Sequence, residues 1–247
     1  WGSGDVKFRL EQDERAVRVY GSVSGLFTMV FGGPTIRVRI WVPREFSVDL
    51  RSTTGSIRVE ELAGKVRART LNGDIEITGV DGPLILRTAR GGVTVSETRG
   101  DVAIRAGEGG IEVSWVTGSV RASTGRGSVR GRHIEGPVEM RTDEGEITLQ
   151  QVRGRIDAKT ETGAVYAGFL GSPEGEIETR RGSVEITIPR DAAIDLDMRS
   201  ADGSVRLDSA FEIDGERAAG HVIGQLNGGG SSLRVYTARG NVRLDRR

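Results

Sequence analysis

Aliphatic and polar residues alternate along most of this chain, and the alternation restarts at a glycine every nine residues. Thirteen consecutive glycines keep this spacing from Gly55 to Gly163, and each is followed two residues later by valine, isoleucine or leucine. Alternation with period two is typical of strands that bury one face, while a glycine every nine residues disfavours helix. The pattern therefore predicts short β-strands separated by turns, with the glycines supplying positive φ at the turns.

The true repeat is eighteen residues long, because alternate nine-residue units differ. One kind ends on an aliphatic residue, and the other carries a threonine three positions before the next glycine. These threonines are Thr70, Thr88, Thr124, Thr142 and Thr160. An eighteen-residue unit cannot bury its own apolar face, so successive units must stack to form a core. We therefore predict an all-β fold, a β-solenoid with about 18 residues and two short strands per coil. An antiparallel meander has the same strands and turns, but it does not need identical side chains two strands apart.

The two ends of the chain depart from the repeat. Residues 1–50 carry strand-like runs at Val6–Leu10, Ala16–Tyr20, Thr35–Val42 and Phe46–Leu50. Because an uncovered solenoid end is an open sheet edge, we predict that residues 1–50 form an N-terminal β cap that merges into the first coil. We assign residues 51–207 to the solenoid repeats. Residues 208–247 are expected to form an irregular loop and C-terminal closing strands over Leu233–Leu244, all within one continuous domain.

Composition and charge narrow the classes of partner. The chain has 247 residues, with 35 basic and 35 acidic side chains and no cysteine. A zero net charge argues against a nucleic-acid partner, and the lack of cysteine excludes disulfides and thiolate sites. The sequence has no apolar run of about 18 residues and no secretory signal. The chain opens on Trp1 rather than Met, as expected for a processed chain, so membrane attachment is expected only through an anchor absent from this sequence.

Several segments of the chain are distinctive beyond the glycine spacing. They are Ile36–Pro43, Phe46–Leu50, Thr54–Ile57, the T-x-x-G-[DS]-[IV] motifs at Thr70–Ile75 and Thr179–Val184, and the ending Leu226–Gly230 with Leu233–Val242. Together they resemble the DUF4097 family of bacterial β-strand-repeat proteins, often labelled adhesins. The resemblance covers about residues 35–245. It implies a β-solenoid that lies outside the cytoplasm, at the cell surface or in the periplasm. It also implies no enzyme activity, and it brings no catalytic residues to this chain.

Basic side chains recur five residues after alternate glycines. They are Arg69, Arg87, Arg105, Arg141 and Lys159, with Ser123 in the series. If the coils stack in register, these side chains lie on one face about 4.8 Å apart, where like charges repel unless something compensates them. Glu139 and Asp157 in the adjacent column would compensate internally. The alternative is an external polyanion, such as an acidic polysaccharide or another envelope polymer, because arginine suits bidentate contacts to carboxylate or phosphate.

The other candidate residues are expected to have structural roles rather than catalytic or metal-binding ones. His133 and His221 are isolated, and the carboxylates of Asp74 and Asp101 do not recur in one turn column, so we expect no metal site. The threonines are expected to satisfy turn backbone groups inside a corner rather than to form an ice-binding plane. The few aromatic residues are scattered and suggest no stacking platform. We therefore expect no catalytic residue and no cofactor.

These observations favour a non-enzymatic binding scaffold of the cell envelope, with an anionic polymer or another protein chain as partner. A protein that assembles end to end is the second hypothesis, since a neutral chain lacks long-range repulsion. The third hypothesis is a polysaccharide-active enzyme, which would need long inserted loops and, in hydrolases, paired carboxylates. The short regular turns disfavour such a cleft.

Overall fold

The structure is a computed structural model that describes residues 5–12, 17–24, 38–209 and 211–247. The chain divides into two units, Trp1–Val42 and Pro43–Arg247. In the first unit, β1 (Asp5–Gln12) and β2 (Val17–Ser24) pair antiparallel. The strand predicted over 35–42 is wrong in its described part, because residues 38–43 form no strand and their side chains are exposed. Residues 35–37 lie outside the described residues.

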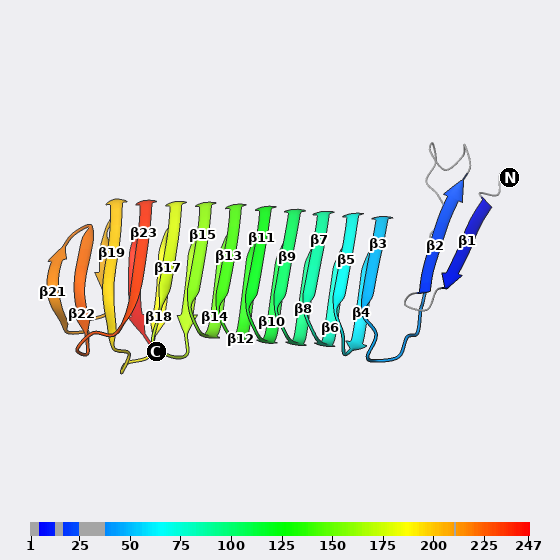
Figure 1. The fold of residues 1–247 in the computed structure, drawn as a ribbon. Helices are drawn as coiled ribbons and strands as arrows, with labels where there is room; N and C mark the ends of the chain where they lie inside the picture. The colour runs from blue at the N-terminus through cyan, green and yellow to red at the C-terminus, as the bar shows by residue number, and fades with distance from the viewer. Residues whose placement is uncertain (1–4, 13–16, 25–37, 210) are drawn as a thin grey trace. The chain divides into compact units, whose positions relative to one another are not determined.

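The second unit is a β-solenoid, as predicted. Figure 1 shows its strands stacked side by side in two layers, and strand pairing forms a 12-stranded and a 10-stranded sheet. In the first sheet the repeats contribute β3 (Val48–Thr54), β5 (Val66–Asn72), β7 (Leu84–Arg90), β9 (Val102–Glu108), β11 (Val120–Arg126), β13 (Val138–Glu144), β15 (Ile156–Thr162) and β17 (Gly175–Arg181). In the second they contribute β4 (Ile57–Leu62), β6 (Ile75–Asp81), β8 (Val93–Arg99), β10 (Ile111–Thr117), β12 (Val129–Glu135), β14 (Ile147–Arg153), β16 (Val165–Phe169) and β18 (Val184–Ile188).

Strand pairing distinguishes the solenoid from the meander. Neighbouring repeat strands are parallel and pair residues eighteen positions apart, as Val120 does with Val138. Consecutive strands therefore lie in different sheets, and about eight turns of 18 residues stack on one another. The alternate residues that point inward are buried aliphatic side chains, which form one continuous core between the sheets. The first coil begins at Val48, three residues before the predicted start of the repeats.

The C-terminal strands lie in the sheets in a different order from their order in the sequence. Its strands are β19 (Ile194–Asp202), β20 (Val205–Leu207), β21 (Ile213–Ala218), β22 (His221–Leu226), β23 (Ser231–Arg239) and β24 (Val242–Arg246). β23 lies between β17 and β19, and β24 lies between β18 and β20. The predicted closing unit is thus a coil inside the stack. Part of the predicted irregular loop forms β21 and β22, which pair antiparallel with each other, and β22 also pairs antiparallel with β19.

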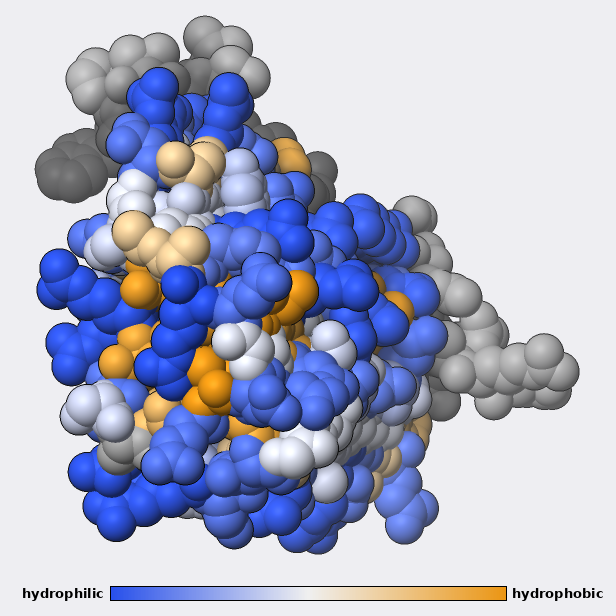
Figure 2. Space-filling view, turned by 90° about the vertical axis from the view of Figure 1, so that its left-hand side faces the viewer, coloured by the Kyte–Doolittle hydropathy of each residue, from blue (hydrophilic) through white to orange (hydrophobic). Residues whose placement is uncertain are grey.

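The end of the stack that carries β21 and β22 exposes apolar surface. Figure 2 looks onto this end and shows orange residues surrounded by blue polar ones. On these strands and on β20, Leu207 and Ile213 pack partly against the core, while Ile223 is 38% exposed. The hairpin therefore covers the core of the last coil only in part.

A bulge recurs at one position of the second sheet. In this sheet, β4, β6, β8, β10, β12 and β14 each hold one residue with φ between 54° and 67°. These residues, here called the bulge column, are Glu61, Gly79, Glu97, Trp115, His133 and Gln151. The strand register skips this residue, so that Ser114 pairs with Arg132 and Val116 with Ile134 around the bulge. Residues other than glycine pay about 1–2 kcal/mol for this left-handed conformation. Two consecutive residues of each bulged strand consequently point outward.

The threonines predicted to face inward do so and form a hydroxyl ladder. Each hydroxyl donates a hydrogen bond to the carbonyl of a turn glycine, at 3.0 Å from Thr142 Oγ1 to Gly127. The ladder consists of Thr70, Thr88, Thr124, Thr142, Thr160, Thr179, Thr237 and Ser200. Ala106 occupies the same register position between Thr88 and Thr124. This arrangement confirms the structural interpretation of the threonines.

Replacing Thr142 with valine is expected to lower the free energy of unfolding by about 1 kcal/mol, because the isosteric side chain removes the hydroxyl donor from the part-buried carbonyl of Gly127. The reverse change, Ala106→Thr, is expected to add about 1 kcal/mol by completing the ladder. Urea denaturation measures both variants, with Thr94→Val on the exposed face of β8 as the control. If Thr142→Val matches this control, the ladder does not stabilise the fold.

Candidate functional site

The predicted basic residues lie in one register column of the 12-stranded sheet, here called the cation column. Arg69 on β5 pairs with Arg87 on β7, which pairs with Arg105 on β9. Ser123 on β11 follows, and then come Arg141 on β13 and Lys159 on β15. All of them point outward, because the residues on either side of each along its strand face the core. The register thus brings all five predicted side chains to one face.

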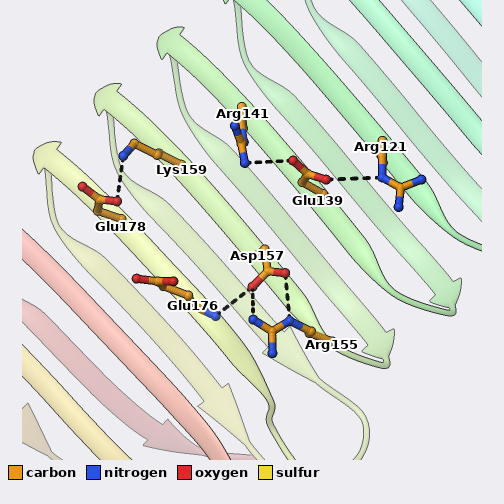
Figure 3. A network of polar contacts seen from close by, with 8 residues as sticks. All are labelled: Arg121, Glu139, Arg141, Arg155, Asp157, Lys159, Glu176 and Glu178. Carbon is orange, nitrogen blue, oxygen red and sulfur yellow. Dashed lines mark hydrogen bonds and ion pairs between the residues drawn. The ribbon is translucent and has the colours of Figure 1, made fainter.

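Ion pairs compensate the cation column on β13 and β15 (Figure 3). Glu139 accepts contacts from Arg141 at 2.9 Å and from Arg121 at 3.3 Å. Lys159 Nζ lies 2.8 Å from Glu178, and this hydrogen bond raises the pKa of the lysine above its usual value. The adjacent column also contains Asp157, which pairs with Arg155 at 2.8 Å. Arg141 and Lys159 therefore have internal partners, and they are poor candidates for binding an external anion.

The column on β5, β7 and β9 is not compensated. Within the described part of the chain, Arg69, Arg87 and Arg105 have no ion pair with a carboxylate. Ile85 and Ala103 hold the adjacent outward positions on β7 and β9, where β13 and β15 carry Glu139 and Asp157. The three guanidinium groups follow one another at strand spacing, which is about 4.8 Å. They form a short strip of positive charge, here called the open arginine strip.

A shallow hollow of about 400 Å³ adjoins the open arginine strip on the same outer face. Its floor contains Ala89 and Gly107, each two residues beyond an arginine of the strip, and Gly125 on the next strand. An added Cβ at Gly107 would lie 2.6 Å from the carbonyl oxygen of Ala89, so this position requires glycine. Small residues on three neighbouring strands thus leave a hollow that runs across the coils. The other residues that line it are Arg90, Glu108, Arg126, Asp143 and Glu144.

The family model described as Toastrack DUF4097 matches residues 65–245. The chain belongs to the DUF4097 family. The match begins just before β5 and ends within β24. It therefore includes the open arginine strip, the hydroxyl ladder and nearly all of the coil formed by β23 and β24. No curated protein and no solved structure matches this DUF4097 chain.

The other charged residues singled out in the sequence of this DUF4097 chain form hydrogen bonds with the backbone or with other side chains. Asp74 accepts a hydrogen bond from the amide of Gly92 at 2.7 Å, and Asp101 accepts one from the amide of Ser119 at 3.0 Å. The bond from the Ser119 hydroxyl, together with that from its amide, lowers the pKa of Asp101. Each carboxylate therefore holds the turn of the next coil. His221 Nε2 lies 3.1 Å from Asp197.

The described residues contain neither a group of three side chains that could hold a metal ion nor a helix long and apolar enough to cross a membrane.

Sequence reasoning missed one pair of residues in the DUF4097 repeat. The rings of Trp115 and His133 are stacked, with centroids 3.7 Å apart and planes 9° from parallel. Trp115 is therefore not an isolated aromatic residue, because it stacks on the ring of His133 in the next coil. The signal was present in the sequence, because residues eighteen positions apart occupy the same place in successive coils.

Proposed function

We propose that this protein is a non-enzymatic binding scaffold, located outside the cytoplasm at the cell surface or in the periplasm. Its proposed ligand is an anionic envelope polymer that lies across the coils on the open arginine strip. The observation that carries this proposal is the contrast within the cation column. Arg141 and Lys159 have carboxylate partners at 2.9 and 2.8 Å, whereas among the described residues Arg69, Arg87 and Arg105 have none.

Repulsion along the open arginine strip supports an external anion. Like charges at neighbouring strand positions destabilise a sheet, and elsewhere in the cation column this repulsion is offset by carboxylates that contact Arg141 and Lys159. An anionic polymer would supply the missing charge, with carboxylate or phosphate groups contacting successive guanidinium groups in a bidentate manner. The adjoining hollow would accommodate the backbone of the polymer. The hollow itself adds no net positive charge, because Arg90 and Arg126 border it together with Glu108, Asp143 and Glu144, and Arg126 is paired with Glu108 at 3.1 Å.

The double substitution Arg87→Ser and Arg105→Ser tests the proposal. Serine occurs naturally at position 123 of the same column, so the fold should accept it. We expect binding of the full chain to polygalacturonate or polyphosphate to weaken about a hundredfold, since each charge-assisted hydrogen bond contributes about 1.5 kcal/mol and thus about tenfold. Calorimetric titration at low salt measures this, and high salt should weaken wild-type binding as well.

The matched control is Arg141→Ser with Lys159→Ser. It removes the same charge from the same column, but from side chains whose anionic partners are internal. We expect the control to reduce binding by less than threefold. Equal losses for the two double variants would show that only net charge matters, and unchanged binding in the first would exclude the open arginine strip as the site.

End-to-end self-assembly is the second candidate function, and one feature of the solenoid favours it. Among the described residues of the unit Pro43–Arg247, β3 and β4 each have one neighbouring strand, so each presents an edge that these residues leave unpaired. Such edges are templates for pairing with another chain. At the other end, β20 has only three residues and β21 carries mostly exposed side chains. We infer that any assembly of this kind would use the β3 and β4 edges.

A further inference from the structure

The Trp115–His133 stack lies on the outer surface of the 10-stranded sheet, on the sheet opposite the open arginine strip. Trp115 is 58% exposed on β10, and His133 stands beside it on β12. Both residues belong to the bulge column, with φ of 56° and 54°. Two residues with bulky rings therefore adopt a backbone conformation that favours glycine, and the ring of Trp115 remains largely exposed to solvent.

Folding alone does not call for aromatic rings at these positions. Gly79 occupies the bulge column on β6, the strand that pairs with β8 of Glu97, and it adopts the same conformation without strain. The core is closed by other residues, such as Val116 and Ile134, which are buried next to the rings. Among the described residues, His133 Nδ1 has no hydrogen-bond partner, so stacking rather than a hydrogen bond orients this ring. Trp115 thus combines a left-handed backbone conformation with a largely exposed ring, a combination more typical of a binding surface than of a structural position.

Planar polar side chains surround the stack. Arg132 precedes His133 and donates a hydrogen bond to Gln150 on β14 at 3.3 Å. Gln151 continues the bulge column beyond His133, and Glu97 precedes Trp115 on β8. A few oriented polar groups around an aromatic surface are the usual composition of a small-ligand site. Here the groups include amide, guanidinium and carboxylate, which can both donate and accept hydrogen bonds.

We propose that the Trp115–His133 stack binds an uncharged saccharide. The apolar face of a sugar ring would pack against the exposed indole, and its hydroxyl groups would exchange hydrogen bonds with Gln151, Glu97 and Arg132. The glutamate disfavours an anionic ligand such as a nucleic-acid strand at this place. This site does not rest on the proposed function, because it lies on the other sheet and uses no residue of the open arginine strip.

The test compares Trp115→Gly with Glu61→Gly in the full chain. Both substitutions relieve the same left-handed strain in the bulge column, so both variants should unfold at a urea concentration no lower than the wild type. The probes are soluble cello-, xylo-, manno- and chito-oligosaccharides, titrated in high salt to suppress binding of charged ligands. Tryptophan fluorescence and calorimetry report binding.

We expect the wild type to bind at least one of these oligosaccharides and Trp115→Gly to lose at least tenfold in affinity. Glu61→Gly should stay within about threefold of the wild type, because Glu61 lies on β4, three strands from Trp115, and contributes nothing to the proposed site. If the wild type binds none of the oligosaccharides, or if Trp115→Gly binds as well as Glu61→Gly does, the proposal is overturned. Binding of polygalacturonate at low salt should be unaffected in both variants, which separates this outcome from that of the open arginine strip.

Discussion

Gly100→Ala is expected to destabilise the solenoid by at least about 3 kcal/mol, because it violates two constraints at once. Gly100 is a turn glycine with φ of 140°, a conformation that side chains rarely adopt. A Cβ at this position would also lie 2.6 Å from the carbonyl oxygen of Gly82 in the preceding coil. Because that carbonyl belongs to the backbone of a stacked turn, neither coil can move without disturbing its neighbours.

Three further glycines separate the two constraints. An added Cβ at Gly107 meets the Ala89 carbonyl oxygen at the same 2.6 Å, but Gly107 has no left-handed φ. Gly228 has φ of 86° with nothing within 4 Å, and Gly171 has neither constraint. We expect the loss of stability on substitution by alanine to be largest for Gly100, intermediate for Gly107 and Gly228, and smallest for Gly171. Urea denaturation gives the order, and a Gly100 variant as stable as the Gly171 variant would refute the double constraint.

The regular part of the fold could be predicted from the sequence because each local rule points to the same structure. The glycine spacing fixes the length of the strands, and the parity of residues between Val66 and Thr70 correctly places the threonine hydroxyl inside the corner. The position of the last coil could not be predicted in this way. Thr179, Thr237 and Ser200 occupy the same register position in three successive coils. The repeat pattern alone therefore does not show whether the coil with Thr237 or the coil with Ser200 stacks directly on the coil with Thr179.

The candidate site shows a similar division. The eighteen-residue spacing was enough to align Arg69, Arg87 and Arg105, and it could also have aligned Trp115 with His133. The difference between paired and unpaired arginines depends on side-chain geometry in adjacent columns, where Arg141 reaches Glu139. The hollow depends on the absence of side chains on neighbouring strands, which becomes visible only when the strands are placed side by side.

Phe169→Ala is expected to cost about 3–5 kcal/mol, the range for removing a buried phenylalanine side chain. Phe169 ends β16, is 2% exposed, and pairs with Val152 after a register shift that omits the bulge found in the preceding coils. The phenyl ring therefore fills the core where the repeat is interrupted. Tyr166→Ala is the control, because it removes an aromatic side chain that is 37% exposed on the outer face of the same strand.

The Tyr166 variant should lose less than about 1.5 kcal/mol, since most of the free energy of a core substitution comes from the cavity and the lost burial. Phe169→Leu should fall between the two variants, because leucine refills part of the cavity. Urea denaturation of the full chain measures the three variants, followed by tryptophan emission, to which Trp115 on β10 contributes from three coils away. If Phe169→Ala costs no more than Tyr166→Ala, the core relaxes around β16, and the interruption of the repeat is not held in place by this ring.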